Sequence, residues 1–367
     1  MFFNRISRVI LAAGVVAAFA GASPASACTG IQLKAADGGV VSGRTLEFGF
    51  LIPTDIVAIP RGSSFASETP IGPGLSWTGK YATVGAALQG ASGLIDGMNE
   101  KGLSVGLFYF PTFASYAETT KETQQRSVAL VDFATWVLTN FATLDELRVA
   151  VGPGGVVIAP TLVKGFPPEP QPVHLVAYDK SGASIVIEPL EGKLKVFDNP
   201  LGVITNSPNF DWHMTNLRNY IALNPRNVPP VTVDGTTFRQ LGQGSGMLGL
   251  PGDFSPPSRF VRAAVFSATA IPSKTTQESV LQVFHILNNF DIPVGVAREE
   301  HDGVVHSDYT MLTTARDPQA LKYYWKTYDD QTIRSVDMHA LDPDAKTIVR
   351  VSTAGPQPVV DETRQMK

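Results

Sequence analysis

The chain has a single cysteine, Cys28, among its 367 residues. An internal disulfide therefore cannot form, and the stability of the fold must come from its packed core. No G-x-S-x-G segment is present, so the sequence lacks the signature of an α/β-hydrolase serine. The six histidines form no H-E-x-x-H pair and no metal-ligand spacing with the cysteine. The sequence therefore predicts no metal centre.

Basic charge and long apolar runs are also scarce. The chain holds 29 Lys and Arg against 33 Asp and Glu, a net charge of −4. A nucleic-acid partner would instead require a basic face. Beyond residue 27 there is no run of about 18 apolar residues, the length that a membrane-spanning helix needs. We therefore expect no nucleic-acid partner and no stable membrane anchor.

Residues 1–27 do contain an apolar run, and its setting is typical of a secretory signal peptide. Arg5 and Arg8 precede the run, and Ala25-Ser26-Ala27 is the small-residue pattern that signal peptidase cuts. We predict that residues 1–27 are removed and that the protein is exported, to the periplasm or outside the cell. The mature chain, 28–367, is then expected to be one domain with a net charge of −6.

Removal of that segment would make Cys28 the first residue of the mature protein. Its thiol and a free α-amine would then lie on one residue. An α-amine with a pKa of about 8 can take the thiol proton near neutral pH, which gives a nucleophile with its own base. Two alternatives remain from the residues alone: a lipid-anchored binding protein modified at Cys28, or an incidental cysteine after the cut. Ala25 is smaller than the residue that lipid attachment usually requires there.

Groups of strands alternate with groups of helices along the rest of the chain. Alternating apolar residues predict strands at 29–34, 40–44, 81–89, 103–110, 174–178, 184–188, 194–197, 202–205, 309–314, 321–328 and 333–338. Three- and four-residue spacing and a capping box predict helices at 128–138, from Thr143 onward, at 257–270 and at 277–289. Asp37-Gly38-Gly39 predicts a hairpin turn after the first strand. This grouping favours an α+β layered fold with largely antiparallel sheets.

A glycine-rich stretch, GSGMLG at 244–249, matches the dinucleotide-binding pattern G-x-G-x-x-G. That function requires a strand just before the glycines and a helix that opens within them. Neither is expected here, because Pro251 and Gly252 follow at once. We interpret the stretch as a tight loop and expect no organic cofactor.

Five segments, in order along the chain, resemble the choloylglycine hydrolase family. They are CTG (28–30), GRTLE (43–47), DGMNEKGL (96–103), TNSPNFDW (205–212) and LPGDFSPPSRF (250–260). Members of this family are N-terminal-nucleophile hydrolases and include penicillin V acylases and conjugated bile salt hydrolases. The resemblance implies an αββα four-layer sandwich, with two stacked and largely antiparallel sheets between helix layers. It also implies a homotetramer.

The resemblance further implies roles for particular residues. Cys28 matches the nucleophile, Arg44 the arginine beside it, Asn206 the asparagine of the oxyanion hole, and Arg259 a second arginine of the site. With an N-terminal cysteine as nucleophile, lipid attachment is disfavoured, because acylation of the amine would destroy the base.

Two further positions differ from the bile salt hydrolase pattern. Glu47 stands where those enzymes typically have Asp, and we expect it to orient the α-amine. Tyr109 stands where they typically have Asn and where penicillin V acylases often have Tyr. We expect its backbone N–H to complete the oxyanion hole.

The substrate is expected to be a small molecule in which an apolar acyl group is joined by a linear amide to a small polar amine. Phe48, Phe108 and Phe110 are predicted to line an aromatic acyl pocket. Tyr109 and Glu47 favour penicillin V or an N-acyl homoserine lactone as the substrate, with a conjugated bile salt as the alternative.

Overall fold

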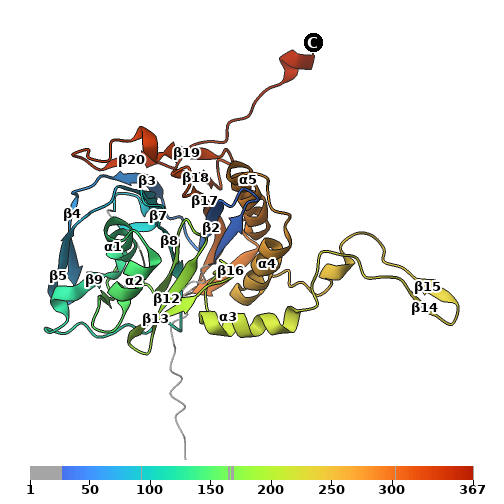
Figure 1. The fold of residues 1–367 in the computed structure, drawn as a ribbon, viewed down its shortest axis with the longest axis horizontal. Helices are drawn as coiled ribbons and strands as arrows, with labels where there is room; N and C mark the ends of the chain where they lie inside the picture. Colours follow the sequence, from blue (N-terminus) through green and yellow to red (C-terminus); the bar gives the residue numbers. More distant parts are fainter. Residues whose placement is uncertain (1–26, 92, 164–165, 167–168, 302, 367) are drawn as a thin grey trace, which may run out of the picture.

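The computed structural model describes residues 27–91, 93–163, 166, 169–301 and 303–366. The predicted signal peptide lies outside this described part except for Ala27. Its removal stays a prediction. The longest axis of the molecule runs from the body to a thin arm that projects on one side (Figure 1).

The first sheet carries Cys28 on an edge strand. Its strands run in the order β1 (Cys28–Lys34), β2 (Val40–Phe48), β17 (Val304–Asp317), β18 (Lys322–Thr327) and β19 (Arg334–Asp337), and β16 (Ala297–His301) also pairs with β17. Every pair is antiparallel. The β1–β2 hairpin turns at Asp37-Gly38-Gly39, as predicted, and Gly38 has a φ of 91°, which glycine adopts without steric cost.

The second sheet has eight strands. Their order is β13 (Lys193–Asp198), β12 (Ser184–Leu190), β11 (Val173–Tyr178), β8 (Ser104–Tyr109), β7 (Leu94–Asn99), β6 (Thr83–Leu88), β3 (Thr54–Ile59) and β20 (Val349–Ser352). These pairs are also antiparallel. Among the described residues, three short pairs lie outside both sheets: β4 (Ser64–Thr69) with β5 (Gly72–Thr78), β9 (Ser127–Ala129) with β10 (Val157–Ala159), and β14 (Val231–Val233) with β15 (Thr236–Phe238).

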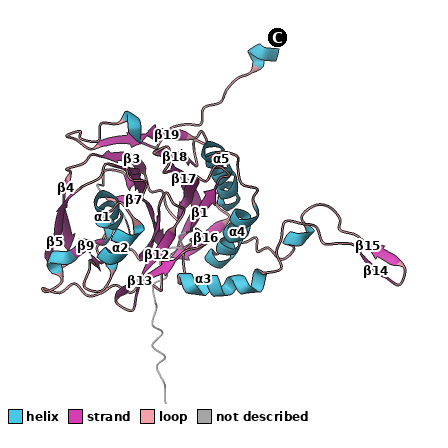
Figure 2. Ribbon diagram, in the orientation of Figure 1, coloured by secondary structure: helices cyan, strands magenta, loops and turns pink. Residues whose placement is uncertain are grey.

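Helices cover the outer face of each sheet (Figures 1 and 2). Residues of α4 (Pro256–Thr269) and α5 (Thr276–Leu287) share one core cluster with β1 and β2, and α1 (Phe133–Asn140) and α2 (Leu144–Val151) share another with the second sheet. Helix α3 (Phe210–Asn216) precedes the projecting arm. Thr143 caps α2 and Thr275 caps α5 in a capping box. The predicted αββα sandwich is confirmed.

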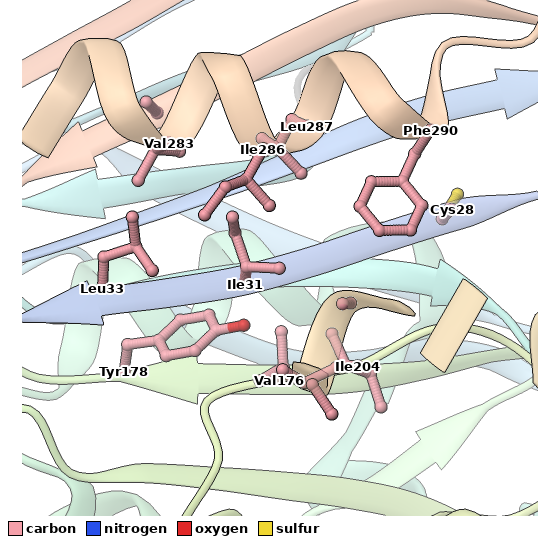
Figure 3. Packing of buried hydrophobic residues seen from close by; sticks show 14 of the residues in the cluster. Cys28, Ile31, Leu33, Val176, Tyr178, Ile204, Val283, Ile286, Leu287 and Phe290 are labelled. Carbon is pink, nitrogen blue, oxygen red and sulfur yellow. The ribbon is translucent and has the colours of Figure 1, made fainter. Parts of the chain in front are cut away.

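Strand β1 is buried on both faces, which fixes the position of its first residue. Figure 3 shows Val283 and Leu287 of α5 on one side of the strand, and Val176 and Tyr178 of β11 on the other. Side chains that interlock on both faces hold a strand rigidly, because protein interiors are close-packed. Cys28 therefore begins a strand that is held in place by packing along its length.

Two predicted elements differ from the structure. The segment at 128–138 starts as strand β9, passes through a 3-10 turn at Leu130–Asp132, and becomes helical only at Phe133. A short buried apolar run has no distinguishing period, so the pattern could not separate strand from helix there. The segment at 202–205 forms only an isolated bridge between Ile204 and Gly30.

That bridge brings the chain after Ile204 against β1. The backbones of Gly30 and Ile204 exchange two hydrogen bonds, of 2.8 and 3.0 Å. A Cβ atom at residue 30 would lie 2.7 Å from Ile204 Cγ2 and 2.8 Å from Phe108 Cζ, so this close approach requires glycine. Asn206 is thereby placed beside Cys28.

Candidate active site

Cys28 is the first residue of β1 and pairs with Leu46 of β2. The residue is 2% exposed, yet it lies on the wall of a cavity of about 640 Å³. A thiol that is shielded from bulk water but open to a cavity can meet a bound ligand without competing solvent.

Arg44 donates a hydrogen bond directly to the cysteine sulfur. Gly30 and Arg44 are register partners, so Cys28 and Arg44 lie on the same face of the hairpin. The distance from Nη2 to Cys28 Sγ is 3.0 Å, and Nη1 donates to the Leu107 carbonyl at 2.7 Å. The guanidinium carbon lies 4.4 Å from the centre of the Phe108 ring. A fixed cation at this distance stabilises negative charge on sulfur.

Asn206 contacts the backbone nitrogen of Cys28. Its Oδ1 accepts from the Cys28 N–H at 2.8 Å and from Arg259 Nη2 at 2.7 Å. Its Nδ2 donates to the Tyr109 carbonyl at 2.7 Å, and the amide carries a second N–H. Asn206 is therefore oriented at both ends of its amide, next to the thiol.

Arg259, on α4, secures the start of β1 from the other side. Its Nη1 donates to the Cys28 carbonyl and, at 2.9 Å, to Thr29 Oγ1, and its Nε donates to the Phe254 carbonyl at 2.8 Å. The residue is 1% exposed. Because Arg259 also donates to Asn206 Oδ1, it links Cys28 to Asn206, although the two lie 178 residues apart in the chain.

The backbone N–H of Tyr109 points away from the neighbouring strand β11. Phe110 N donates to the Pro172 carbonyl at 2.8 Å, and Tyr109 faces Val173 in the register. Because hydrogen-bonded and non-hydrogen-bonded pairs alternate in an antiparallel ladder, the Tyr109 N–H is turned toward the β7 side. Gly93, which precedes β7, lines the same cavity as Tyr109. This orientation suits a donor to a group bound in the cavity.

Glu47 lies on the opposite face of β2 from Arg44 and is 1% exposed. Thr310 Oγ1 donates to its Oε1 at 2.9 Å. Burial raises the pKa of Glu47 to about 8, although the charge of Arg259 opposes the shift. The carboxyl group therefore stays protonated near neutral pH. Its expected role in orienting the amine stays a prediction, whereas Asn206 makes the observed contact with the Cys28 nitrogen.

This raised pKa predicts how stability depends on pH. Between pH 4.5 and 8 the unfolded chain loses a proton that the folded protein keeps at Glu47. The free energy of unfolding should therefore fall with rising pH, by about 1.4 kcal/mol per unit from this group. In Glu47→Gln this contribution to the slope of unfolding free energy against pH should vanish, as measured by urea titrations at a series of pH values. Glu68→Gln, the same substitution at an exposed position of β4, is the control. An identical slope in Glu47→Gln and the parent would contradict the assignment.

The cavity wall is mainly apolar and is drawn from both sheets and from the segments before α1 and β11. Its described lining residues are Cys28, Leu46, Phe48, Ile52, Leu88, Gln89, Gly90, Ala91, Gly93, Leu94, Ile95, Leu107, Tyr109, Leu130, Val131, Asp132, Leu162, Val163, Phe166, Gln171 and Val173. Phe48, predicted to bind substrate, meets Phe166 edge to face with ring centres 5.3 Å apart. Phe166 stands outside any periodic pattern, so no local signal in the sequence predicts its place on the cavity wall.

Phe108 and Phe110 are placed elsewhere, and the expectation that they line the pocket is corrected. Phe108 packs beneath the Arg44 guanidinium, and Phe110 stacks on His174 with ring centres 4.4 Å apart. Successive side chains of a strand point to opposite faces. Leu107 and Tyr109 therefore face the cavity, and Phe108 and Phe110 face the core.

The described residues contain no group of three or more His, Cys, Asp and Glu side chains placed to hold a metal ion. Among the helices that they form, none is both long and apolar enough to span a membrane.

Comparisons with known proteins agree with this geometry. The family described as linear amide C-N hydrolases, choloylglycine hydrolase family, matches residues 28–350. A bile salt hydrolase/transferase from Clostridium perfringens is 34% identical over 88% of this chain and 95% of its own length. A solved variant of the conjugated bile acid hydrolase from the same organism has a TM-score of 0.80 at 32% identity, covering 91% of this chain and 99% of that chain. A penicillin V acylase from Pectobacterium atrosepticum is 27% identical over 72% of this chain and 68% of its own length.

Proposed function

Since the chain belongs to the choloylglycine hydrolase family of linear amide C–N hydrolases, we propose that its substrates are conjugated bile salts. Relatives named as bile salt hydrolases share more sequence with it, 34% against 27% for the penicillin V acylase. This reverses the order expected from Tyr109 and Glu47. As an amide hydrolase, the chain is no longer interpreted as a lipid-anchored binding protein.

The cavity beside Cys28 supports a steroid acyl group. Its volume of about 640 Å³ lies within the range of pockets that hold drug-sized ligands. Asp132 lies on its otherwise largely apolar wall, accepts from Ser67 Oγ at 2.7 Å, and makes no capping bond to its own helix. Such a carboxyl group offers an acceptor to a hydroxyl on the acyl group. Bile acids carry ring hydroxyls, whereas phenoxyacetyl and simple fatty acyl groups do not.

The mechanism that we propose uses the thiol and the α-amine of one residue. The amine of mature Cys28 takes the thiol proton, and the thiolate stabilised by Arg44 attacks the amide carbonyl. Asn206 Nδ2 and the Tyr109 N–H donate to the resulting oxyanion. The leaving amine takes the proton back from the α-ammonium as the C–N bond breaks. Water, deprotonated by the same amine, then hydrolyses the thioester and restores the thiol.

The substrate proposal is tested by comparing specificity constants of the mature enzyme on glycocholate, penicillin V and an N-acyl homoserine lactone. We expect kcat/KM for glycocholate to exceed the other two by about tenfold or more, which corresponds to 1.4 kcal/mol. Cys28→Ala supplies the blank for each substrate. A preference for penicillin V or the lactone would reject the bile salt proposal and leave the reaction class untouched.

The projecting arm supports the homotetramer that we propose for this chain. The pair β14–β15 extends away from the body (Figure 1), and every residue of both strands is exposed. Val231, Phe238 and Leu241 are 57%, 62% and 108% exposed. Apolar side chains gathered on such an extension are typical of a surface that another copy covers.

We expect Val231→Asp/Phe238→Asp/Leu241→Asp to dissociate the oligomer, because charges would be buried without partners at the contact. Light scattering after size exclusion should show a tetramer for the parent and a smaller species for the triple variant. Val149→Asp, at an exposed position of α2, is the matched control and should stay tetrameric. A monomeric parent, or an unchanged mass in the triple variant, would contradict this assignment.

A further inference from the structure

Three buried polar side chains lie around the Thr205–Asn206 segment, and none of them is among the described lining residues of the substrate cavity. They are His174 on β11, Glu188 on β12 and His213 on α3, which are 1%, 0% and 1% exposed. Buried polar groups are costly unless each is hydrogen-bonded. The partners of these three side chains therefore indicate what they hold in place.

Both ring nitrogens of His174 have defined partners. Nδ1 lies 3.0 Å from Glu188 Oε1, and Nε2 lies 3.0 Å from the carbonyl oxygen of Thr205. A carbonyl oxygen only accepts, so Nε2 carries a hydrogen and donates it to Thr205. Glu188 also contacts the start of α3, where Phe210 N donates to both of its carboxyl oxygens, at 3.0 and 3.2 Å.

Aromatic stacking fixes the orientation of the His174 and His213 rings. Phe110 stacks on His174 at 4.4 Å with an interplanar angle of 6°, and Phe260 stacks on His213 at 4.5 Å with an angle of 10°. His213 Nε2 lies 3.0 Å from the Asn206 carbonyl. The two imidazoles therefore hold two consecutive carbonyls, those of Thr205 and Asn206.

We propose that His174 is a positioning residue for the oxyanion hole: its Nε2–H fixes the Thr205 carbonyl and thereby aims the Asn206 amide at the reacting carbonyl. This rests on the proposed mechanism, in which Asn206 donates to the oxyanion. An oxyanion donor that is already oriented before the reaction needs no reorganisation during it, and this lowers the barrier. The competing explanation is that His174 serves only as a hydrogen-bond partner of the buried Glu188, which accepts from the first residue of α3.

The two nitrogens of His174 allow these roles to be separated. In His174→Gln, the side-chain amide nitrogen reaches as far as Nε2 and keeps the bond to Thr205, but the Nδ1 contact with Glu188 is lost. In His174→Asn, the amide reaches only as far as Nδ1, so it keeps the Glu188 contact and loses Thr205. Each variant thus removes one bond and retains the other.

The experiment compares kcat and KM of the two variants per active thiol, with Cys28 titrated by a thiol reagent, on whichever amide the parent hydrolyses best. We expect His174→Gln to keep kcat within a few-fold, and His174→Asn to lose on the order of tenfold in kcat with KM unchanged. Equal kcat values, the reverse order, or a loss that appears only in the fraction of active thiol would overturn the proposal.

Two controls keep this outcome distinct from other failures. If loss of a partner for the buried Glu188 side chain prevents a variant from folding, both substitutions are made in a Glu188→Gln background, which replaces the carboxyl group with a neutral amide. Asn206→Ala is measured in parallel. If Asn206→Ala keeps full activity, the proposed mechanism fails. If Asn206→Ala loses activity but His174→Gln and His174→Asn have equal kcat values, the positioning role of His174 fails.

Discussion

Replacing Cys28 with alanine is expected to abolish amide hydrolysis. Alanine keeps the start of β1 intact, and the contacts of Cys28 with Asn206 and Arg259 are made by its backbone. Loss of a nucleophile costs on the order of 10⁶ in kcat, which would leave no measurable turnover of glycocholate. Cys28→Ser should react far more slowly than the parent, since an alkoxide is harder to generate than a thiolate.

Thermal unfolding and circular dichroism provide the control for this prediction. Both variants should unfold close to the parent temperature, because they keep the backbone contacts of Cys28 with Asn206 and Arg259 and remove or exchange only the sulfur atom. Activity near the parent level in a folded Cys28→Ala protein would refute the proposed mechanism.

The second large effect is expected at the oxyanion hole. Asn206→Ala should reduce kcat on the order of 10²–10³-fold, the effect of removing one oxyanion donor. The structure indicates a loss at the upper end, because Asn206 Oδ1 also orients the Cys28 nitrogen and Arg259. Steady-state kinetics on glycocholate, corrected for active thiol, would measure it.

Tyr109→Phe is the matched variant for this test. It keeps the backbone N–H and the ring, so we expect it to retain much of the parent kcat. Were it to lose as much activity as Asn206→Ala, the phenolic hydroxyl would be part of the chemistry and our division of roles would be wrong.

Local patterns were sufficient to predict much of the fold. The Asp37-Gly38-Gly39 hairpin, the cap of α2 at Thr143, and helices α4 and α5 all appear where the sequence indicated them. Each depends on turn chemistry, capping or periodicity within a few residues. The arm with β14 and β15 was not predicted, because the residues of both strands are exposed and no buried face imposes a pattern on them.

The site was predictable only in part, since it is assembled from distant segments. Asn206 and Arg259 reach Cys28 through the bridge at Gly30 and through the packing of α4. No local pattern carries that information, and the two were identified by family resemblance. The error at Phe108 and Phe110 was avoidable. Tyr109 lies between them on one strand, so all three could not face the same cavity.

Hydrolysis by a thiol at a newly formed N-terminus is the hypothesis on which the proposed mechanism rests. It is tested most directly by mixing exported enzyme with glycocholate, quenching in acid within milliseconds, and sequencing the N-terminal peptide by mass spectrometry. We predict a peptide that starts with Cys28-Thr29-Gly30 and carries the cholyl group as a thioester on the cysteine sulfur. Recovery of a peptide that retains Ala27, or of an acyl group on any other residue of active enzyme, would contradict the account.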